Sequence, residues 1–482
     1  MQPKVVQRIL GLLLCIFSMT MIPPAIVGYM YNDGGMRTFI LSFLILLVAG
    51  GLMVWRVENH HAQLKLRDGY LIVVLFWTVL GVAGAVPLLV SEYPQLTVMQ
   101  AIFESMSGLT TTGATVIVGL DYLPKSILFY RQELVWLGGM GIIVLAIAIL
   151  PALGIGGMQL FKAETSRAQT DSKLTPRIAG TAKALWLIYM SLTVVCTCAY
   201  FWAGMSPFDA ISHAFSTVAI GGFSTHDASI GFFDSRAVEI VAIVFMFLSG
   251  INFSLHFLAW RNYGLSPYKQ DSEFKHYSAF LLLVSAVVVF GLFLTSEMNF
   301  SDAAITGVFH TVSLATTTGF STTEYYNWAG SLPFILLCTS FVGGCAGSTG
   351  GGLKVVRVML LFRQGLRELT RMVHPHALVV IKIGKSRVSD RQIAVIWGFF
   401  SAYVGIFVFF LIILITLGLD QITAFSALVA CMNNLGPGLG EVAANYSTID
   451  DAPLAIMCFA MLMGRLEIFT LLVLFTPAFW RK

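Results

Sequence analysis

The chain has 482 residues, of which 57% are hydrophobic and only 11% are charged, and its formal net charge is +4. Soluble domains carry about 25% charged residues, so this composition excludes an ordinary soluble protein. Ten apolar runs, most of them at or above the roughly 20 residues needed to cross a bilayer, predict an all-α polytopic membrane protein. The runs cover residues 10–30, 38–55, 70–90, 134–153, 182–201, 237–258, 280–294, 332–362 (interrupted), 393–417 and 453–475.

The N-terminal segment, residues 1–60, is predicted to form a two-helix unit. Its first apolar run lacks a small-residue cleavage site and is followed at once by a second run. We therefore interpret it as a retained span and not as a signal peptide.

Charge is distributed unevenly between the two sides that ten crossings define. The side with both termini holds 24 of the 29 Lys and Arg, and the other side holds 16 of the 25 Asp and Glu. Basic residues favour the cytoplasm, so both termini are predicted to be cytoplasmic, in a bacterial inner membrane. The acidic outer face attracts cations, which indicates a cation as the ligand. The basic inner face either follows from topology alone or docks an acidic partner.

Four segments after the N-terminal unit share one pattern around a glycine. The anchors Gly113, Gly222, Gly319 and Gly436 stand 109, 97 and 117 residues apart. Before each anchor lies a moderately apolar stretch that is too short to span, and three of these stretches carry helix-start residues, at Ser206, Ser301–Asp302 and Asp420. Each unit is predicted to run span, short re-entrant helix, Thr/Gly loop, span. The units are 68–165, 181–262, 275–373 and 391–482.

The four loops predict a pore on a pseudo-fourfold axis. Non-helical backbone at membrane depth is tolerated only inside protein or along a water-filled path. Carbonyl and Thr oxygens can replace the water around a cation, and Gly allows the carbonyls to aim at the axis. One such loop would be an ordinary turn, but its recurrence favours a selectivity filter, although the second and fourth loops lack the Thr run. The predicted filter residues are Thr111, Thr112, Gly113, Ile220, Gly221, Gly222, Thr317, Thr318, Gly319, Asn434, Leu435 and Gly436.

Polar residues stand nine positions before three of the anchors. They are Glu104, His213 and His310. Two interpretations remain open: they support the filter by hydrogen bonding, or they merely pack beside it.

On these loops the chain resembles the Trk/Ktr/HKT superfamily of cation transporters, and within it the TrkH-type members of bacterial Trk systems. The resemblance covers essentially the whole chain, including the two extra N-terminal spans that the Ktr type lacks. It implies K⁺ uptake, a homodimer in membrane lipid, and gating by a cytosolic nucleotide-binding partner such as TrkA. In some sodium-selective relatives Ser replaces the first filter glycine, whereas this chain keeps Gly113.

The stretch GGCAGSTGGG interrupts the second span of the third unit. Glycine costs about 1 kcal/mol in a helix interior, so a continuous helix is not expected. One interpretation is close helix packing through small residues. The other, which the resemblance supports, is an intramembrane loop that closes the pore below the filter. Its glycines are Gly343, Gly344, Gly347, Gly350, Gly351 and Gly352.

Arg465 is the only basic residue predicted well inside a span. Such a charge usually faces a partner or a water-filled cavity. It either forms a structural pair with Glu467 or stands at the pore as an electrostatic barrier, as the resemblance suggests.

Other functions have less support. A secondary transporter coupling K⁺ to H⁺ or Na⁺ on the same fold remains the alternative, although such proteins are usually built from inverted repeats. No HExxH, G-x-S-x-G or Walker A motif occurs, so we expect neither an enzyme nor a nucleotide bound by this chain. Nucleic-acid binding is not expected, because topology already accounts for the basic loops.

Overall fold

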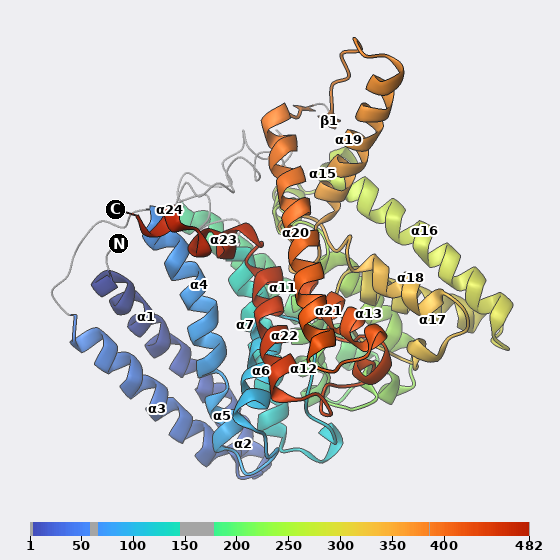
Figure 1. The fold of residues 1–482 in the computed structure, drawn as a ribbon. Helices are drawn as coiled ribbons and strands as arrows, with labels where there is room; N and C mark the ends of the chain where they lie inside the picture. Colours follow the sequence, from blue (N-terminus) through green and yellow to red (C-terminus); the bar gives the residue numbers. More distant parts are fainter. Residues whose placement is uncertain (1–2, 58–65, 145–177, 385, 482) are drawn as a thin grey trace.

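The structure is a computed structural model that describes residues 3–57, 66–144, 178–384 and 386–481. Figure 1 shows a nearly all-helical molecule, and β-structure in the described ranges is limited to one short antiparallel hairpin. Its strands are β1 (Lys382–Ile383) and β2 (Ser386–Arg387). Residues 145–177, which include the end of the predicted span 134–153 and the end of the predicted unit 68–165, fall outside the described residues.

The N-terminal unit consists of α1 (Pro3–Ser18), α2 (Ile22–Tyr31) and α3 (Gly35–Trp55). Helices α1 and α3 lie side by side (Figure 1), and a Cβ added at Gly11 would meet the Gly50 carbonyl oxygen at 2.9 Å. Small residues therefore permit the close approach of the two backbones.

Four successive stretches of chain share one order of elements: a long helix, a short buried helix, an extended loop and a second helix. The long helices are α4 (Leu66–Ala83, continued by α5, Val86–Val90), α11 (Ile178–Trp202), α16 (Ser272–Thr295) and α20 (Asp390–Thr416). The short helices are α6 (Val98–Leu109), α12 (Pro207–Ala219), α17 (Phe300–Ala315) and α21 (Gln421–Met432).

The second helices differ more from one another. They are α7 (Lys125–Val144), α13 (Arg236–Ser249) with α14 (Phe253–Arg261), α18 (Leu332–Thr339) with α19 (Val355–Val373), and α22 (Asp451–Arg465) with α23 (Phe469–Leu472). Two further short helices are α15 (Ser266–Gln270) and α24 (Pro477–Trp480).

Side-chain caps fix where the short helices begin. Ser206 accepts a hydrogen bond from the Asp209 backbone, and Asp420 accepts from the second and third residues after it, as predicted. The start predicted at Ser301 was wrong, because Asn299 caps α17 two residues earlier. Thr97, which the sequence analysis missed, caps α6 in a reciprocal capping box.

Six described helices are long and apolar enough to cross a membrane, and eight if each of two bent pairs counts as one span. Ten crossings were predicted. The other two predicted spans correspond to α7, which carries Lys125, Arg131 and Glu133, and to the interrupted pair α18–α19.

Two predicted spans, 237–258 and 453–475, are not continuous. The chain bends by 92° between α13 and α14 and by 109° between α22 and α23. At the first break, Gly250 accepts a backbone hydrogen bond from Cys345, and Phe253 donates one to Gly347. The Gly-rich segment of the third unit thus satisfies the backbone groups that the broken helix leaves free.

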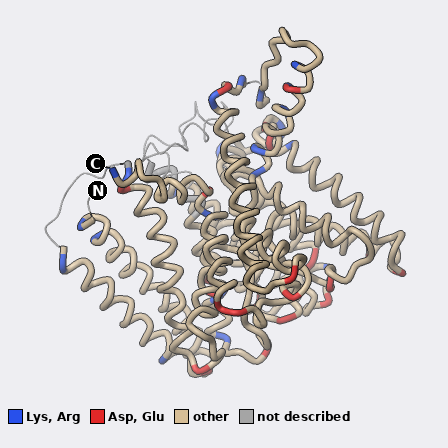
Figure 2. The backbone as a smooth tube through the Cα atoms, viewed as in Figure 1, with Lys and Arg blue, Asp and Glu red and all other residues tan. Residues whose placement is uncertain are grey.

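Figure 2 shows how the charges separate along the molecule. Most Lys and Arg lie at the end that carries both termini and the β-hairpin, and most Asp and Glu lie toward the opposite end. The short helices and their loops are arranged between these two ends (Figure 1).

Candidate ion pathway

The four predicted filter loops share one unusual backbone conformation. In each loop the anchor glycine and the residue two before it have positive φ, while the residue between them does not. Left-handed backbone is rare outside Gly, and for a β-branched residue such as Ile220 it is an outlier that persists only where the surroundings enforce it. The angles are 52° and 82° at Thr111 and Gly113, 56° and 68° at Ile220 and Gly222, 69° and 85° at Thr317 and Gly319, and 54° and 97° at Asn434 and Gly436.

Each anchor glycine packs on a carbonyl of the next loop. A Cβ added at Gly113 would overlap the carbonyl oxygen of Gly221, one at Gly222 that of Thr318, and one at Gly319 that of Leu435. A Cβ at Gly436 would lie 2.7 Å from the carbonyl oxygen of Thr112. Thr112 belongs to the first loop, so this contact closes the cycle. The four loops therefore form a closed ring, and the structure brings all twelve predicted filter residues into it.

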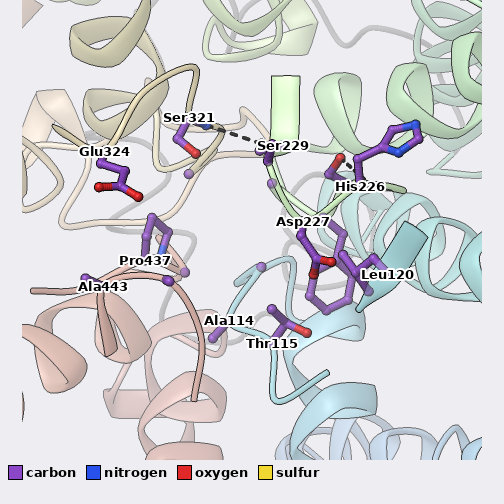
Figure 3. A pocket seen from close by; sticks show the side chains of 18 of the residues that line it. Ala114, Thr115, Leu120, His226, Asp227, Ser229, Ser321, Glu324, Pro437 and Ala443 are labelled. Carbon is purple, nitrogen blue, oxygen red and sulfur yellow. Dashed lines mark hydrogen bonds between the residues drawn. The ribbon is translucent and has the colours of Figure 1, made fainter. Parts of the chain in front are cut away.

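A cavity of about 300 Å³ opens on one side of the ring, lined by residues that follow the anchors in all four loops. Figure 3 shows the loops approaching it from four sides, with Thr115, Asp227, Glu324 and Pro437 each from a different unit. Carboxylates on its wall make it suited to concentrating cations.

Polar side chains of the short helices hold the loops just beyond each anchor. Glu104 accepts hydrogen bonds from Thr115 Oγ1 at 3.0 Å and Val116 N at 2.9 Å. His213 Nε2 lies 2.9 Å from Ser224 Oγ, and His310 Nε2 accepts from Thr322 N at 3.4 Å. Of the two open interpretations, these contacts favour support of the loops over packing alone.

The fourth unit has Ala427 at the equivalent position and uses its neighbour instead. Ser426 Oγ accepts a hydrogen bond from Leu439 N and donates one to Leu439 O, both at 2.9 Å. The support is thus present in every unit but differs in chemistry.

Arg131 on α7 is a supporting residue that the sequence analysis counted only as an outer-face charge. Its side chain is 1% exposed, and Nε forms an ion pair of 2.8 Å with Glu104. Its Nη1 donates to the carbonyl oxygen of Ser224 at 3.2 Å, so one cation joins the first loop to the second. The available signal was an Arg that stands three residues before the predicted span 134–153.

The Gly-rich segment 343–352 packs against the C-terminal ends of three short helices. Gly351 N donates to Thr317 Oγ1 at 2.7 Å, and a Cβ at Gly351 would overlap the carbonyl oxygen of Asn433. Thr349 Oγ1 donates to the carbonyl oxygen of Val218 at 3.1 Å. The segment therefore lies on the side of the ring opposite the cavity.

Arg465 contacts this same segment. It is the last residue of α22, its side chain is 7% exposed, and Nη1 donates to the carbonyl oxygen of Thr349 at 3.1 Å. The alternative of a structural pair with Glu467 is wrong, because Glu467 pairs with Arg357 at 2.9 Å. The break between α22 and α23 turns these two neighbouring charges to different partners.

Comparison with known proteins gives a consistent result. The family model of TrkH cation transport proteins matches residues 35–482. The Trk system potassium uptake protein TrkH of Vibrio parahaemolyticus is 54% identical over all of both chains, and that of Escherichia coli K12 is 52% identical over 99% of each. The crystal structure of the potassium transporter TrkH from Vibrio parahaemolyticus covers all of both chains with a TM-score of 0.93 and 52% identity. The chain therefore belongs to the TrkH family of cation transport proteins, which are transporters and not enzymes.

Proposed function

We propose that this protein takes up K⁺ through a pore whose selectivity filter is the ring of four loops. The observation that carries the proposal is the closed cycle in which each anchor glycine packs on a carbonyl of the next loop. Backbone carbonyls arranged around an axis replace the hydration shell of a cation. The short helices end at the ring, so the negative ends of their dipoles favour a positive ion there. The similar proteins are named as potassium uptake proteins.

The gate of this pore consists of the Gly-rich segment and Arg465. The segment contacts the C-terminal ends of three short helices, and Arg465 donates to its Thr349 carbonyl. A cation passing about 4 Å from the guanidinium would meet about 4 kcal/mol of repulsion at an effective dielectric of about 20. Opening therefore requires this segment and the charge to move off the axis.

The gate is tested by Arg465→Ala and Gly351→Ala. Removing the charge should raise K⁺ flux in liposomes. A methyl at Gly351 should displace the segment from the Asn433 carbonyl and change the flux. Gly365→Ala is the control, because nothing lies within 4 Å of a Cβ at that α19 position. Reduced flux in a folded Arg465→Ala protein would contradict the barrier.

The protein is proposed to sit in a bacterial inner membrane with both termini cytoplasmic, which the separation of charges in Figure 2 supports. It is proposed to have an N-terminal unit, 1–60, and pore units at 68–165, 181–262, 275–373 and 391–482. It is proposed to work as a homodimer with a TrkA-like nucleotide-binding subunit, since the relatives are named as parts of a Trk system.

The experiment that tests the filter compares K⁺ and Na⁺ flux for the wild type and Gly113→Ser in liposomes. Ser at this position must adopt φ 82° and displace the Gly221 carbonyl, so the preference for K⁺ over Na⁺ should fall. Gly119→Ser is a matched control, because Gly119 has φ 77° and its added Cβ would come no closer than 4.0 Å to a neighbour. An unchanged preference in Gly113→Ser would overturn the filter. Reversal potentials that follow a proton gradient would indicate coupled transport.

A further inference from the structure

The four anchor carbonyls are not equivalent. Within the described part of the chain, the carbonyl oxygen of Gly436 accepts a hydrogen bond, from Tyr446 Oη at 2.8 Å, whereas those of Gly113, Gly222 and Gly319 accept none. One anchor carbonyl is therefore held by a side chain of the protein, and the other three are not.

Tyr446 is itself rigidly placed. It is 1% exposed, and its backbone N–H donates to the carbonyl oxygen of Thr115 in the first loop at 2.8 Å. Its ring packs on Phe103 of α6, with ring centroids 5.3 Å apart. The phenol that binds the fourth loop is thus positioned by the first unit, and it borders the cavity next to the ring.

The residue after Gly436 adds a second constraint. Pro437 has no backbone N–H and a fixed φ, which limits how the chain can turn beyond the anchor. Its ring lies beside the third anchor, since a Cβ added at Gly319 would be 2.7 Å from Pro437 Cδ. The Gly436 carbonyl is therefore restrained from both of its neighbouring loops.

We propose that Tyr446 is a positioning residue that sets the preference of the filter for K⁺ over a smaller cation. A carbonyl oxygen has two acceptor sites, so Gly436 can bind the phenol and still face an ion. A hydrogen bond that holds this oxygen in place keeps it from moving inward toward Na⁺, and selectivity depends on the number and field strength of the coordinating carbonyls. This inference rests on the proposed filter.

The test is Tyr446→Phe, which removes the phenol hydroxyl and leaves the ring and the backbone hydrogen bond. The K⁺/Na⁺ permeability ratio, measured from reversal potentials in liposomes, should fall about fivefold, the factor that corresponds to the net ~1 kcal/mol of one neutral hydrogen bond. Phe103→Leu, which keeps the phenol but loosens its ring, should lower the ratio less.

Tyr325→Phe is the matched control. Tyr325 is also 1% exposed, and its hydroxyl donates to the carbonyl oxygen of Gly438 at 3.2 Å, two residues beyond the anchor. It should lose similar thermal stability but keep the wild-type ratio. A change in ratio equal to that of Tyr446→Phe would show general loosening and overturn the inference.

The outcomes separate this inference from the filter itself. If Gly113→Ser changes the ratio and neither Tyr446→Phe nor Phe103→Leu does, the filter stands and the role of Tyr446 falls. If none of the three changes it, both proposals fall.

Discussion

The first and fourth loops are neighbours in the ring, and they have the same backbone but different supports. Thr111 and Gly113 in one, and Asn434 and Gly436 in the other, have positive φ in the same order, 52° and 82° against 54° and 97°. The first loop is held by the buried ion pair between Glu104 and Arg131. The fourth is held by neutral groups: Ser426, Tyr446, and Asn434 Nδ2, which donates to Thr112 Oγ1 at 2.9 Å.

This difference shows that the ring geometry does not need one particular chemistry behind it. The left-handed residues and the close glycine contacts set the shape, and either charged or neutral partners can hold it. The free-energy cost of losing a partner differs between the two kinds of support, however. Losing one half of a buried ion pair leaves an uncompensated charge, whereas losing a neutral hydrogen bond leaves a single polar group unpaired.

The largest expected effect follows from breaking the charged support. Glu104→Gln should destabilise the protein by about 3–5 kcal/mol, because the Arg131 guanidinium would remain buried without its carboxylate. Thermal unfolding in detergent should show a large drop, and K⁺ flux should be lost.

The control is the double variant Glu104→Gln with Arg131→Met, which removes both charges. It should recover part of the stability lost in the single variant. If the single and double variants are equally unstable, the buried charge is not the cause and the comparison of the two loops fails.

A smaller effect is expected from the neutral support. Ser426→Ala removes the two hydrogen bonds to Leu439 and should cost about 1–3 kcal/mol. K⁺ flux should persist at reduced thermal stability. A loss as large as that of Glu104→Gln, measured in the same detergent, would mean that neutral and charged supports are equally critical.

The smallest expected effect is a pH dependence of the thermal stability, which arises from His226 and its two carboxylate neighbours. His226 forms an ion pair with Asp121 in η2 (Leu120–Tyr122), and its Nε2 lies 3.5 Å from Asp209 Oδ1 on α12. Partial burial acts to lower the pKa of His226, but the hydrogen bonds and charges of Asp209 and Asp121 outweigh it and raise the pKa above its ordinary value.

The sign follows from that raised pKa. The stabilisation by protonated His226 is complete below the ordinary His pKa of about 6.5. It is lost as the pH rises through the raised pKa of His226 in the folded protein. Thermal unfolding should therefore show slightly lower stability at alkaline pH, by less than about 1 kcal/mol. His226→Gln should remove this slope, and Ser426→Ala should leave it unchanged; a slope retained in His226→Gln would assign it to another group.

Much of the candidate pathway could be predicted from sequence because it depends on local chemistry. Glycine is the residue that tolerates both left-handed backbone and contact with a neighbouring carbonyl, so the recurrence of Gly113, Gly222, Gly319 and Gly436 marked the ring. The caps at Ser206 and Asp420 could also be predicted, because a cap depends only on residues next to it in the chain.

The features that were missed depend on contacts between distant segments. Ile220 ends α12 in the left-handed conformation, which is unfavourable for a β-branched residue, and it is fully buried where the ring packs around it. The bend at Gly250 is stabilised by hydrogen bonds from the Gly-rich segment, about a hundred residues later in the chain. Arg131 looked like a surface charge because its partners, Glu104 and Ser224, lie in other helices and loops.

The cycle of glycine contacts runs through one continuous polypeptide and not through four identical subunits. A single codon change therefore alters one quarter of the ring, while in a homotetrameric channel it would alter every quarter at once. Mutation can consequently change one loop of this ring while the other three stay the same. The hydrogen bond from the Tyr446 phenol to the Gly436 carbonyl is one such difference between the loops.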